Sequence, residues 1–286
     1  MSFLGFGSSY ENAGSGIAKN APKKNKFFRF FEGYFDRFWK MVRLSLLTFL
    51  FCIPVVTVGP AVAGMTKVLR SFVLDKDVFL FHEFMRGFKE NWKKSLPVGI
   101  VDLIFLLSLF ASLTVYPSMA EAAKASGGSS AGYTILCVIS VGFALTIFMM
   151  NFYLFPMIVS TELPLSKAIK NSFYLTALEL KTNIITLVII LLLSAFMLIL
   201  TFLSNVFILL LIPFMLISFV GFLIMFNCYP VIQKYVIDPY YKERGQDNPE
   251  YDFLKPLDPD DAVFTDKGGE EAPIKIQKKN AKKVIK

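Results

Sequence analysis

The feature that most constrains this chain is a set of four long apolar stretches, which together contain a single charged residue, Asp102. They lie at about 96–117, 132–159, 182–203 and 206–230. At 1.5 Å per residue, each can form a helix that crosses a hydrocarbon core about 30 Å thick. Only 18% of all residues are charged, against about a quarter in an ordinary soluble domain, and the mean hydropathy is +0.55. The sequence therefore predicts an all-α fold, a polytopic bundle in a lipid bilayer, and argues against a disordered chain, a disulfide scaffold or a soluble enzyme.

Two shorter apolar stretches precede these four, at about 42–58 and 60–75. A helix of 16 residues reaches only about 24 Å, which is less than the hydrocarbon thickness. The two stretches therefore either cross the membrane as a full hairpin or form a re-entrant loop. The sequence predicts about six spans, or four spans plus a re-entrant hairpin.

The turn between the two short stretches is marked by Pro54, Thr57, Gly59 and Pro60. We expect Gly59 to supply the permissive backbone of the turn. Pro60 suits the first position of the following helix, where no N–H is needed. The Thr57 hydroxyl is placed to satisfy backbone groups that the broken helix leaves open.

Three further segments are amphipathic, at 27–42, 80–95 and 164–181. Aromatic and aliphatic side chains recur at helical spacing in each, opposite charged side chains, which is typical of a helix lying in the membrane interface. Helices in this position can also contact a partner protein. The residues expected to make such contacts are Phe84, Phe88, Lys89 and Trp92 in the second segment, and Lys170, Asn171 and Phe173 in the third.

The basic residues are distributed asymmetrically. All 30 Lys and Arg residues except Lys124 lie before or near the start of the first span, between 67 and 94, between 164 and 181, or after the last span. Because basic residues collect on the cytoplasmic side, we expect both termini in the cytoplasm. This pattern explains the net charge of +8 without nucleic acid as a partner. The expected parts are a flexible arm (1–26), a membrane domain (27–235) and a mostly disordered cytoplasmic tail (236–286).

Asp102 is the residue with the sharpest functional hypothesis. A carboxylate at membrane depth is costly and usually faces a partner or water, and Lys67 and Arg70 on the second short stretch are expected at its level. These groups could form a site that couples transport to a proton or ion, or a structural ion pair. Asn151 is the deep polar residue of the fourth span, where an interhelical hydrogen bond is the expected role.

The sequence offers little else for chemistry. The three cysteines lie in apolar runs without a C-x-x-C pair, and the chain has one histidine, His82, so no metal site is predicted. We find no P-loop, HExxH or GxSxG motif. We therefore expect no catalytic residue, no cofactor and no enzyme activity.

The stretch from Cys52 to Ala61, which reads Cys-Ile-Pro-Val-Val-Thr-Val-Gly-Pro-Ala, resembles a motif of the YesL-like membrane proteins, a family catalogued as domain of unknown function 624. The resemblance continues at Phe84-x-x-x-Phe88-Lys89-x-Asn91-Trp92 and around Lys170-Asn171-Ser172-Phe173, and it covers roughly 27–235. The early Phe3-Leu4-Gly5-Phe6-Gly7 resembles longer members from Gram-positive bacteria. The resemblance therefore implies a location in a bacterial cell membrane. The resemblance implies a role near carbohydrate ABC importers, because members are often encoded beside their binding proteins and permeases. It supplies no catalytic or ligand-binding residues.

The function expected from these observations is that of a non-catalytic, accessory or regulatory membrane protein for carbohydrate ABC uptake, with importer subunits as partners. One alternative is a transporter or channel in its own right that uses Asp102 with Lys67 and Arg70. Another is a membrane scaffold. The oligomeric state stays open at this stage.

Overall fold

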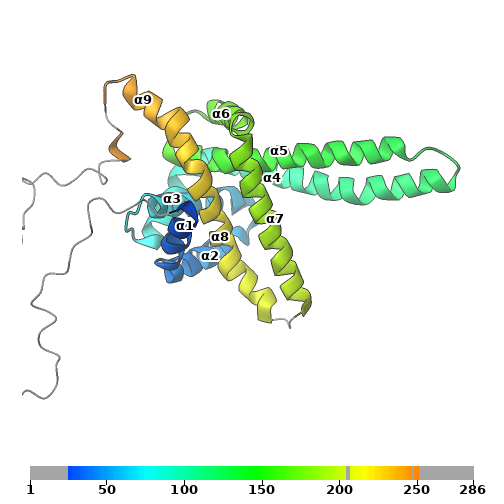
Figure 1. Ribbon diagram of the computed structural model, residues 1–286, viewed down its shortest axis with the longest axis horizontal. Helices are drawn as coiled ribbons and strands as arrows, with labels where there is room; N and C mark the ends of the chain where they lie inside the picture. The colour runs from blue at the N-terminus through cyan, green and yellow to red at the C-terminus, as the bar shows by residue number, and fades with distance from the viewer. Residues whose placement is uncertain (1–24, 204–206, 247, 251–286) are drawn as a thin grey trace, which may run out of the picture. The chain divides into compact units, whose positions relative to one another are not determined.

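The computed structural model describes residues 25–203, 207–246 and 248–250, and within them the chain forms helices and turns without a strand. The expected all-α fold is confirmed. The helices are α1 (Lys26–Phe35), α2 (Phe38–Cys52), α3 (Val58–Val73), α4 (Leu80–Ala125), α5 (Ala131–Ser160), α6 (Leu165–Leu178), α7 (Leu180–Leu203), α8 (Phe207–Ile232) and α9 (Asp238–Lys242), with a 3-10 turn η1 (Val55–Thr57) and a π-helical turn η2 (Gln233–Ile237) (Figure 1).

Four helical stretches of the described chain are long and apolar enough to cross a membrane: Leu80–Ala125, Ala131–Ser160, Leu180–Leu200 and Met215–Lys242. In the most apolar windows of the first two, only 11% and 6% of residues are buried inside the protein. A surface of this kind would be unstable in water, whereas lipid can cover it. The chain is a helical membrane protein.

The longest helix, α4, joins two elements that the sequence analysis treats separately. The amphipathic segment 80–95 and the span 96–117 form one helix that continues through Pro97 and Pro117 to Ala125. The gap between the predicted stretches 96–117 and 132–159 would suggest a loop at 118–131 after Pro117, and this is wrong. Residues 118–125 are rich in alanine and other strong helix formers, and the actual turn is confined to 126–130.

The short hairpin of α2 and α3 also differs from expectation. Helix α2 begins at Phe38 and ends at Cys52, and α3 already begins at Val58. Gly59 and Pro60 therefore lie inside the first turn of α3, and the turn itself is formed by 53–57. Pro60 remains tolerated because the first-turn N–H groups have no intrahelical partner. Thr57 acts as expected, since its hydroxyl donates to the carbonyls of Phe51 and Pro54 at 2.5 and 2.7 Å.

Glycines bring α3 and α4 into close contact. A Cβ added to Gly99 would lie 2.6 Å from the Cα of Gly59, and one added to Gly87 would lie 3.0 Å from the Cα of Gly64. Helix α3 thus packs against the first part of α4, up to the start of its long apolar stretch. Its other sides are covered by α2, α5 and α8, so α3 is the central helix of the described protein.

Helices α1 and α6 are amphipathic, but the faces that they bury are narrower than predicted. On α1, Phe30 and Tyr34 pack against Phe219 and Phe222 of α8, while Phe27 stays exposed. On α6 the buried residues are Ala168, Ser172, Leu175 and Thr176, whereas the apolar side chains of Ile169 and Phe173 are exposed. Each helix therefore keeps an apolar strip free for lipid or for another protein.

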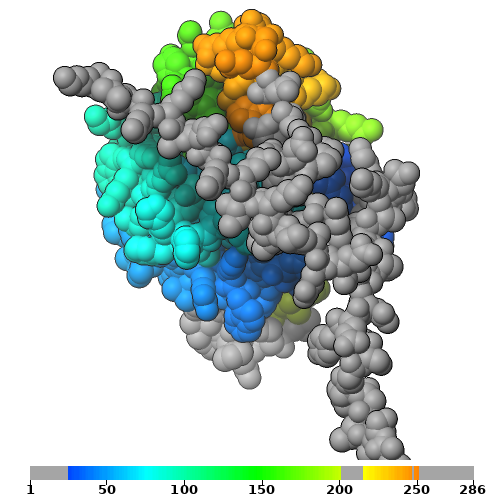
Figure 2. Space-filling model, turned by 90° about the vertical axis from the view of Figure 1, so that its left-hand side faces the viewer, coloured from blue at the N-terminus to red at the C-terminus, as the bar shows by residue number. Residues whose placement is uncertain are grey.

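The two long hairpins, α4/α5 and α7/α8, leave the central helices in different directions (Figure 1). The end of the molecule away from the α4/α5 tip is formed by α2, the start of α4 and the region of α9 (Figure 2). Three expected parts lie outside the described residues: residues 1–24 of the arm, the turn at 204–205 and the tail beyond Glu250. The described start of the tail is not all irregular, because it contains α9.

Candidate functional site

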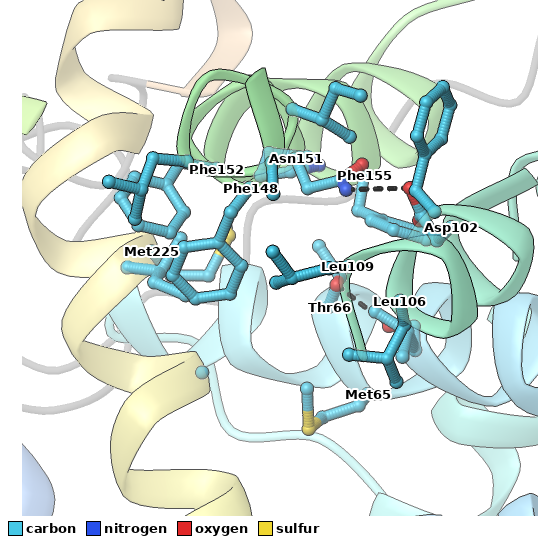
Figure 3. Close-up of a pocket in the computed structure, with 18 of the residues that line it drawn as sticks. Met65, Thr66, Asp102, Leu106, Leu109, Phe148, Asn151, Phe152, Phe155 and Met225 are labelled. Carbon is cyan, nitrogen blue, oxygen red and sulfur yellow. Dashed lines mark hydrogen bonds between the residues drawn. The ribbon is translucent and has the colours of Figure 1, made fainter. Parts of the chain in front are cut away.

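A cavity of about 510 Å³ lies where the α4/α5 hairpin meets α3 and α8. On α4, the residues that line it recur at i, i+3, i+4 and i+7, which is one face of a helix. Helix α5 contributes the facing wall, α3 contributes residues from Val62 to Leu69, and α8 contributes residues from Gly221 to Met225. Thr66, Asp102 and Asn151 are the polar side chains of a lining that is otherwise apolar (Figure 3).

Asp102 and Asn151 face one another across the gap between α4 and α5 (Figure 3). The amide nitrogen of Asn151 donates a hydrogen bond of 2.9 Å to Asp102 Oδ1. The third polar residue, Thr66, donates to the carbonyl of Val62 in its own helix at 2.7 Å. Asp102 and Asn151 therefore form the polar group that the cavity offers to a ligand.

The expected pairing of Asp102 with Lys67 or Arg70 is not formed. Lys67 makes an ion pair with Glu90, and Arg70 makes one with Glu250. The Cβ position of Gly87 contacts Lys67, and Asp102 lies about 22 Å further along the same helix. The expectation that the three residues share a level is wrong because α4 continues unbroken past α3.

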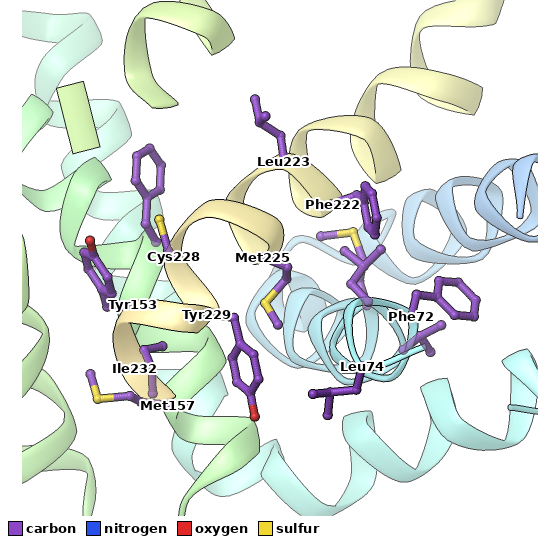
Figure 4. Packing of buried hydrophobic residues seen from close by; sticks show 14 of the residues in the cluster. Phe72, Leu74, Tyr153, Met157, Phe222, Leu223, Met225, Cys228, Tyr229 and Ile232 are labelled. Atoms are coloured by element: carbon purple, nitrogen blue, oxygen red, sulfur yellow. The ribbon is translucent and has the colours of Figure 1, made fainter. Parts of the chain in front are cut away.

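Arg70 belongs to a second polar group, which lies at the C-terminal end of α3. Its Nε donates to the Tyr229 hydroxyl at 2.7 Å, its guanidinium pairs with Glu250, and Tyr229 donates to the same carboxylate at 2.6 Å. Gln233 donates to the other oxygen of Glu250 at 2.8 Å. Figure 4 shows Tyr229 on α8. Helix α8 packs against Tyr153 and Met157 of α5 on one side and against Phe72 at the end of α3 on the other. Glu250 thereby fastens the segment after α9 to the core.

The charge state of Glu250 follows from this network. Burial alone would raise the pKa of the Glu250 carboxyl, but the Arg70 guanidinium and the hydrogen bonds from Tyr229, Arg70 and Gln233 outweigh it, so the pKa is held below its usual value. The carboxyl is therefore ionised at neutral pH, and the anchor is an ion pair.

The residues expected to form a contact surface on the 80–95 segment are divided between the core and the exterior. Phe84 is fully buried, and its ring lies 5.4 Å from that of Phe51 on α2. Phe88 packs beside it, 5.2 Å from the same ring. Lys89 and Trp92 remain exposed. Phe84 and Phe88 thus hold α4 against α2, and the fully buried Phe84 is not available to a partner.

On α6, the predicted residues stay near the surface. Phe173 is 52% exposed, and Lys170 is exposed with its Nζ 5.9 Å from the centre of the Tyr174 ring. Asn171 is half-buried and lines a broad groove between α6 and the region of η2 and α9. The groove also contains Arg70 and Glu250 and has a volume of about 1050 Å³. Helix α6 therefore offers a mixed aromatic and basic face beside this groove.

Sequence reasoning missed two features. Glu250 lies in the tail that was expected to be irregular, and no local pattern points from it to Arg70, which precedes it by 180 positions. The close contacts of Gly64, Gly87 and Gly99 between α3 and α4 are the second feature. Their signal is present in the sequence, because Gly64, Gly87 and Gly99 stand inside helical patterns where glycine costs about 1 kcal/mol and needs a packing reason.

Residues 43–113 match the model of a family described as Protein of unknown function, DUF624. The predicted resemblance is confirmed over this segment. The DUF624 segment runs from α2 through about the first three quarters of α4, so it includes the turn at Pro54–Thr57, the glycine contacts and Asp102. No curated protein and no solved structure matches the chain.

Proposed function

We propose that the protein is a non-catalytic, multi-pass protein of a bacterial cell membrane, and that it acts by protein contact as an accessory or regulatory component of carbohydrate ABC uptake. The link to sugar importers comes from the resemblance to YesL-like proteins. The proposal adds a physical means of contact, which is the outward face of α6.

The observation that carries the proposal is the division of α6 into two faces. Ala168, Ser172, Leu175 and Thr176 are buried, and α6 packs on the end of α5. The opposite side presents Lys167, Lys170, Phe173 and Tyr174. A short helix between two membrane hairpins, packed on one side and aromatic and basic on the other, is suited to contact a protein at the cytoplasmic surface.

The test is purification of the tagged protein from its native membrane at native expression levels in mild detergent, followed by mass spectrometry. We expect an importer permease or its ATPase to accompany the parent protein and to be reduced several-fold in a Lys170→Glu, Phe173→Ala double variant. Phe143→Ala is the matched control, since Phe143 is equally exposed but lies in the apolar part of α5. Recovery of the parent protein without any importer subunit would contradict the proposal.

We also propose that four helices cross the membrane and that the α2/α3 hairpin does not. In support, the start of α3 at Gly59 contacts Ser95 and Gly99 of α4, where the long apolar stretch of α4 begins. The hairpin therefore lies beside the basic part of α4, which is expected on the cytoplasmic side.

A cysteine at Val56, in a variant without the native cysteines, tests this topology with a membrane-impermeant thiol reagent. We expect no labelling from the outside, whereas a cysteine at Ser129 in the α4/α5 turn should be labelled there. Labelling of both positions from the outside would show that the hairpin crosses.

The second candidate function is transport, and the observation that favours it is the cavity with Asp102 at the junction of the hairpins. If the parent protein supports flux in proteoliposomes, Asp102→Asn should abolish it. Unchanged flux in the variant would exclude a coupling role for this carboxylate.

A further inference from the structure

The cavity at the hairpin junction has a polar end and an apolar end. On α4, Asp102 is the lining residue nearest the basic part of the helix, about 12 Å along it from Lys94, and Asn151 faces Asp102 from α5. Leu109 lies about 10 Å further in the other direction, among Val141, Leu145 and Phe148. The cavity therefore has the polarity of an amphiphile in one leaflet, with a polar head towards the basic residues and a chain towards the bilayer centre.

The carboxylate at the polar end is not neutralised by a cation of the described chain. Lys67 and Arg70, the basic residues of the adjacent α3, pair with Glu90 and Glu250. Asp102 Oδ1 accepts from Asn151, and no described residue donates to Oδ2, although Asp102 is only half-buried. An acceptor in apolar surroundings without a donor is costly, so a ligand with a hydrogen-bond donor would satisfy it.

The cavity is accessible from the lipid. Leu106, Leu145 and Phe148 line it and are also exposed on the surface of the α4/α5 hairpin. Its volume of about 510 Å³ falls within the roughly 300–1,000 Å³ typical of small-molecule sites. A molecule dissolved in the bilayer can therefore enter sideways, without passing through water.

We propose that this cavity binds a single-chain amphiphile whose donor head, an ammonium or a hydroxyl group, is attached directly to an aliphatic chain. The head donates to Asp102 Oδ2, and the chain lies along the apolar wall formed by α4, α5 and α8. An ammonium is favoured over a hydroxyl because it also compensates the charge of the carboxylate. A fatty acid is disfavoured because two carboxylates would face each other, and a phospholipid because its phosphate would enter the apolar part. The assignment does not depend on the proposed role in ABC uptake.

The test uses the full-length protein in lipid nanodiscs and three photoreactive probes with the same hexadecyl chain, namely the amine, the alcohol and the carboxylic acid. We expect the amine to label the cavity residues of α4, α5 and α8 most strongly, and the acid roughly tenfold less, as befits the loss of a charge-assisted hydrogen bond. Labelled residues are located by peptide mass spectrometry. Equal labelling by the three probes, spread along the outer faces of α4 and α5, would overturn the proposal.

Two variants separate the head from the chain. Asp102→Asn should remove the preference for the amine over the alcohol while leaving alcohol labelling in place. Ala144→Phe, which fills the cavity from α5, should lower labelling by both probes several-fold. Gly142→Phe is its control, because a side chain at Gly142 meets open space and this residue does not line the cavity.

These variants also distinguish a different occupant. If Ala144→Phe reduces recovery of a partner membrane protein but leaves labelling by the amine and the alcohol unchanged, the cavity seats a helix and the amphiphile proposal is wrong. If the three probes label the cavity only when Asp102 is replaced, the carboxylate excludes ligands and the proposal is also wrong.

Discussion

Gly59 and Gly99 meet at the crossing of α3 and α4, where a Cβ on Gly99 would lie 2.6 Å from the Cα of Gly59. A Cβ on Gly59 would lie still closer, 2.1 Å, to the carbonyl oxygen of Ser95. Both obstacles are backbone atoms, so neither can be avoided by a rotamer change. This contact sets how closely the central helix approaches α4, and hence the width of the cavity that both helices line.

Replacing Gly99 by alanine should therefore destabilise the protein. The added methyl group forces the two backbones apart, and overpacking of this kind costs roughly 1–3 kcal/mol. The measurement is equilibrium unfolding in mixed micelles. Gly142→Ala is the control, because it adds the same methyl group to a helix in open space and should gain up to about 1 kcal/mol of helix propensity. Equal effects of the two substitutions would show that the close approach is unimportant.

Replacing Glu250 by glutamine should release the segment that follows α9. Arg70 and Tyr229 would lose the carboxylate that they share, and a lost hydrogen bond to a charged group costs roughly 1.5–3 kcal/mol. We expect faster amide hydrogen exchange in residues 233–250 with little change in α4 and α5. Glu243→Gln, at an exposed position of the same segment, should leave the exchange rates unchanged.

The same anchor should depend on pH in one direction. Because the pKa of Glu250 is lowered in the folded protein, its contribution is fully present above the pKa of an unfolded glutamate, about 4.3, and is lost as the pH falls through the lower folded value. Protection of residues 233–250 should therefore be constant from about pH 7 to pH 5 and decline below about pH 4. In Glu250→Gln this acid-dependent part should disappear. An identical decline in the variant would assign the effect to another group.

The sequence predicts a helix well where the residues of that segment alone determine it. The four long apolar stretches become candidate spans because a helix satisfies the backbone hydrogen bonds of such a segment within the segment itself, as lipid requires. The predicted helix ends are wrong where two local preferences compete. Pro117 removes one hydrogen bond, but the alanine-rich residues after it and the neighbouring α5 keep α4 helical to Ala125. Gly59 reads as a turn residue from its backbone freedom, whereas its actual role is the contact with Gly99.

The candidate site depends on contacts that no local pattern specifies. Asp102 is conspicuous in the sequence because it is the single charge of the long apolar stretches. Asn151 is conspicuous as a polar amide deep inside the stretch 132–159. Their pairing requires knowing that α4 and α5 are antiparallel neighbours in this register. The alternative partners, Lys67 and Arg70, had the right charge but lie against earlier residues of α4 and against α8. Charge complementarity alone therefore predicts the wrong partners for Asp102. Because α4 continues well beyond its contact with Lys67, Asp102 lies too far along the helix to pair with Lys67 or Arg70.

Asp102 and Asn151 should be energetically coupled, and a double-mutant cycle measures this. Asn151→Leu removes the donor to Asp102 Oδ1, Asp102→Asn changes the acceptor, and the pair of substitutions together closes the cycle. Hydrogen bonds between membrane helices average about 0.6 kcal/mol, with a maximum near 1.7, and a bond to a carboxylate belongs in the upper half of this range. Thr66→Val combined with Asp102→Asn is the control and should show no coupling, because the Thr66 hydroxyl bonds to its own helix. A coupling energy near zero for Asp102 and Asn151 would mean that the carboxylate is satisfied by water or by a ligand, and that the hydrogen bond of 2.9 Å does not hold α4 to α5.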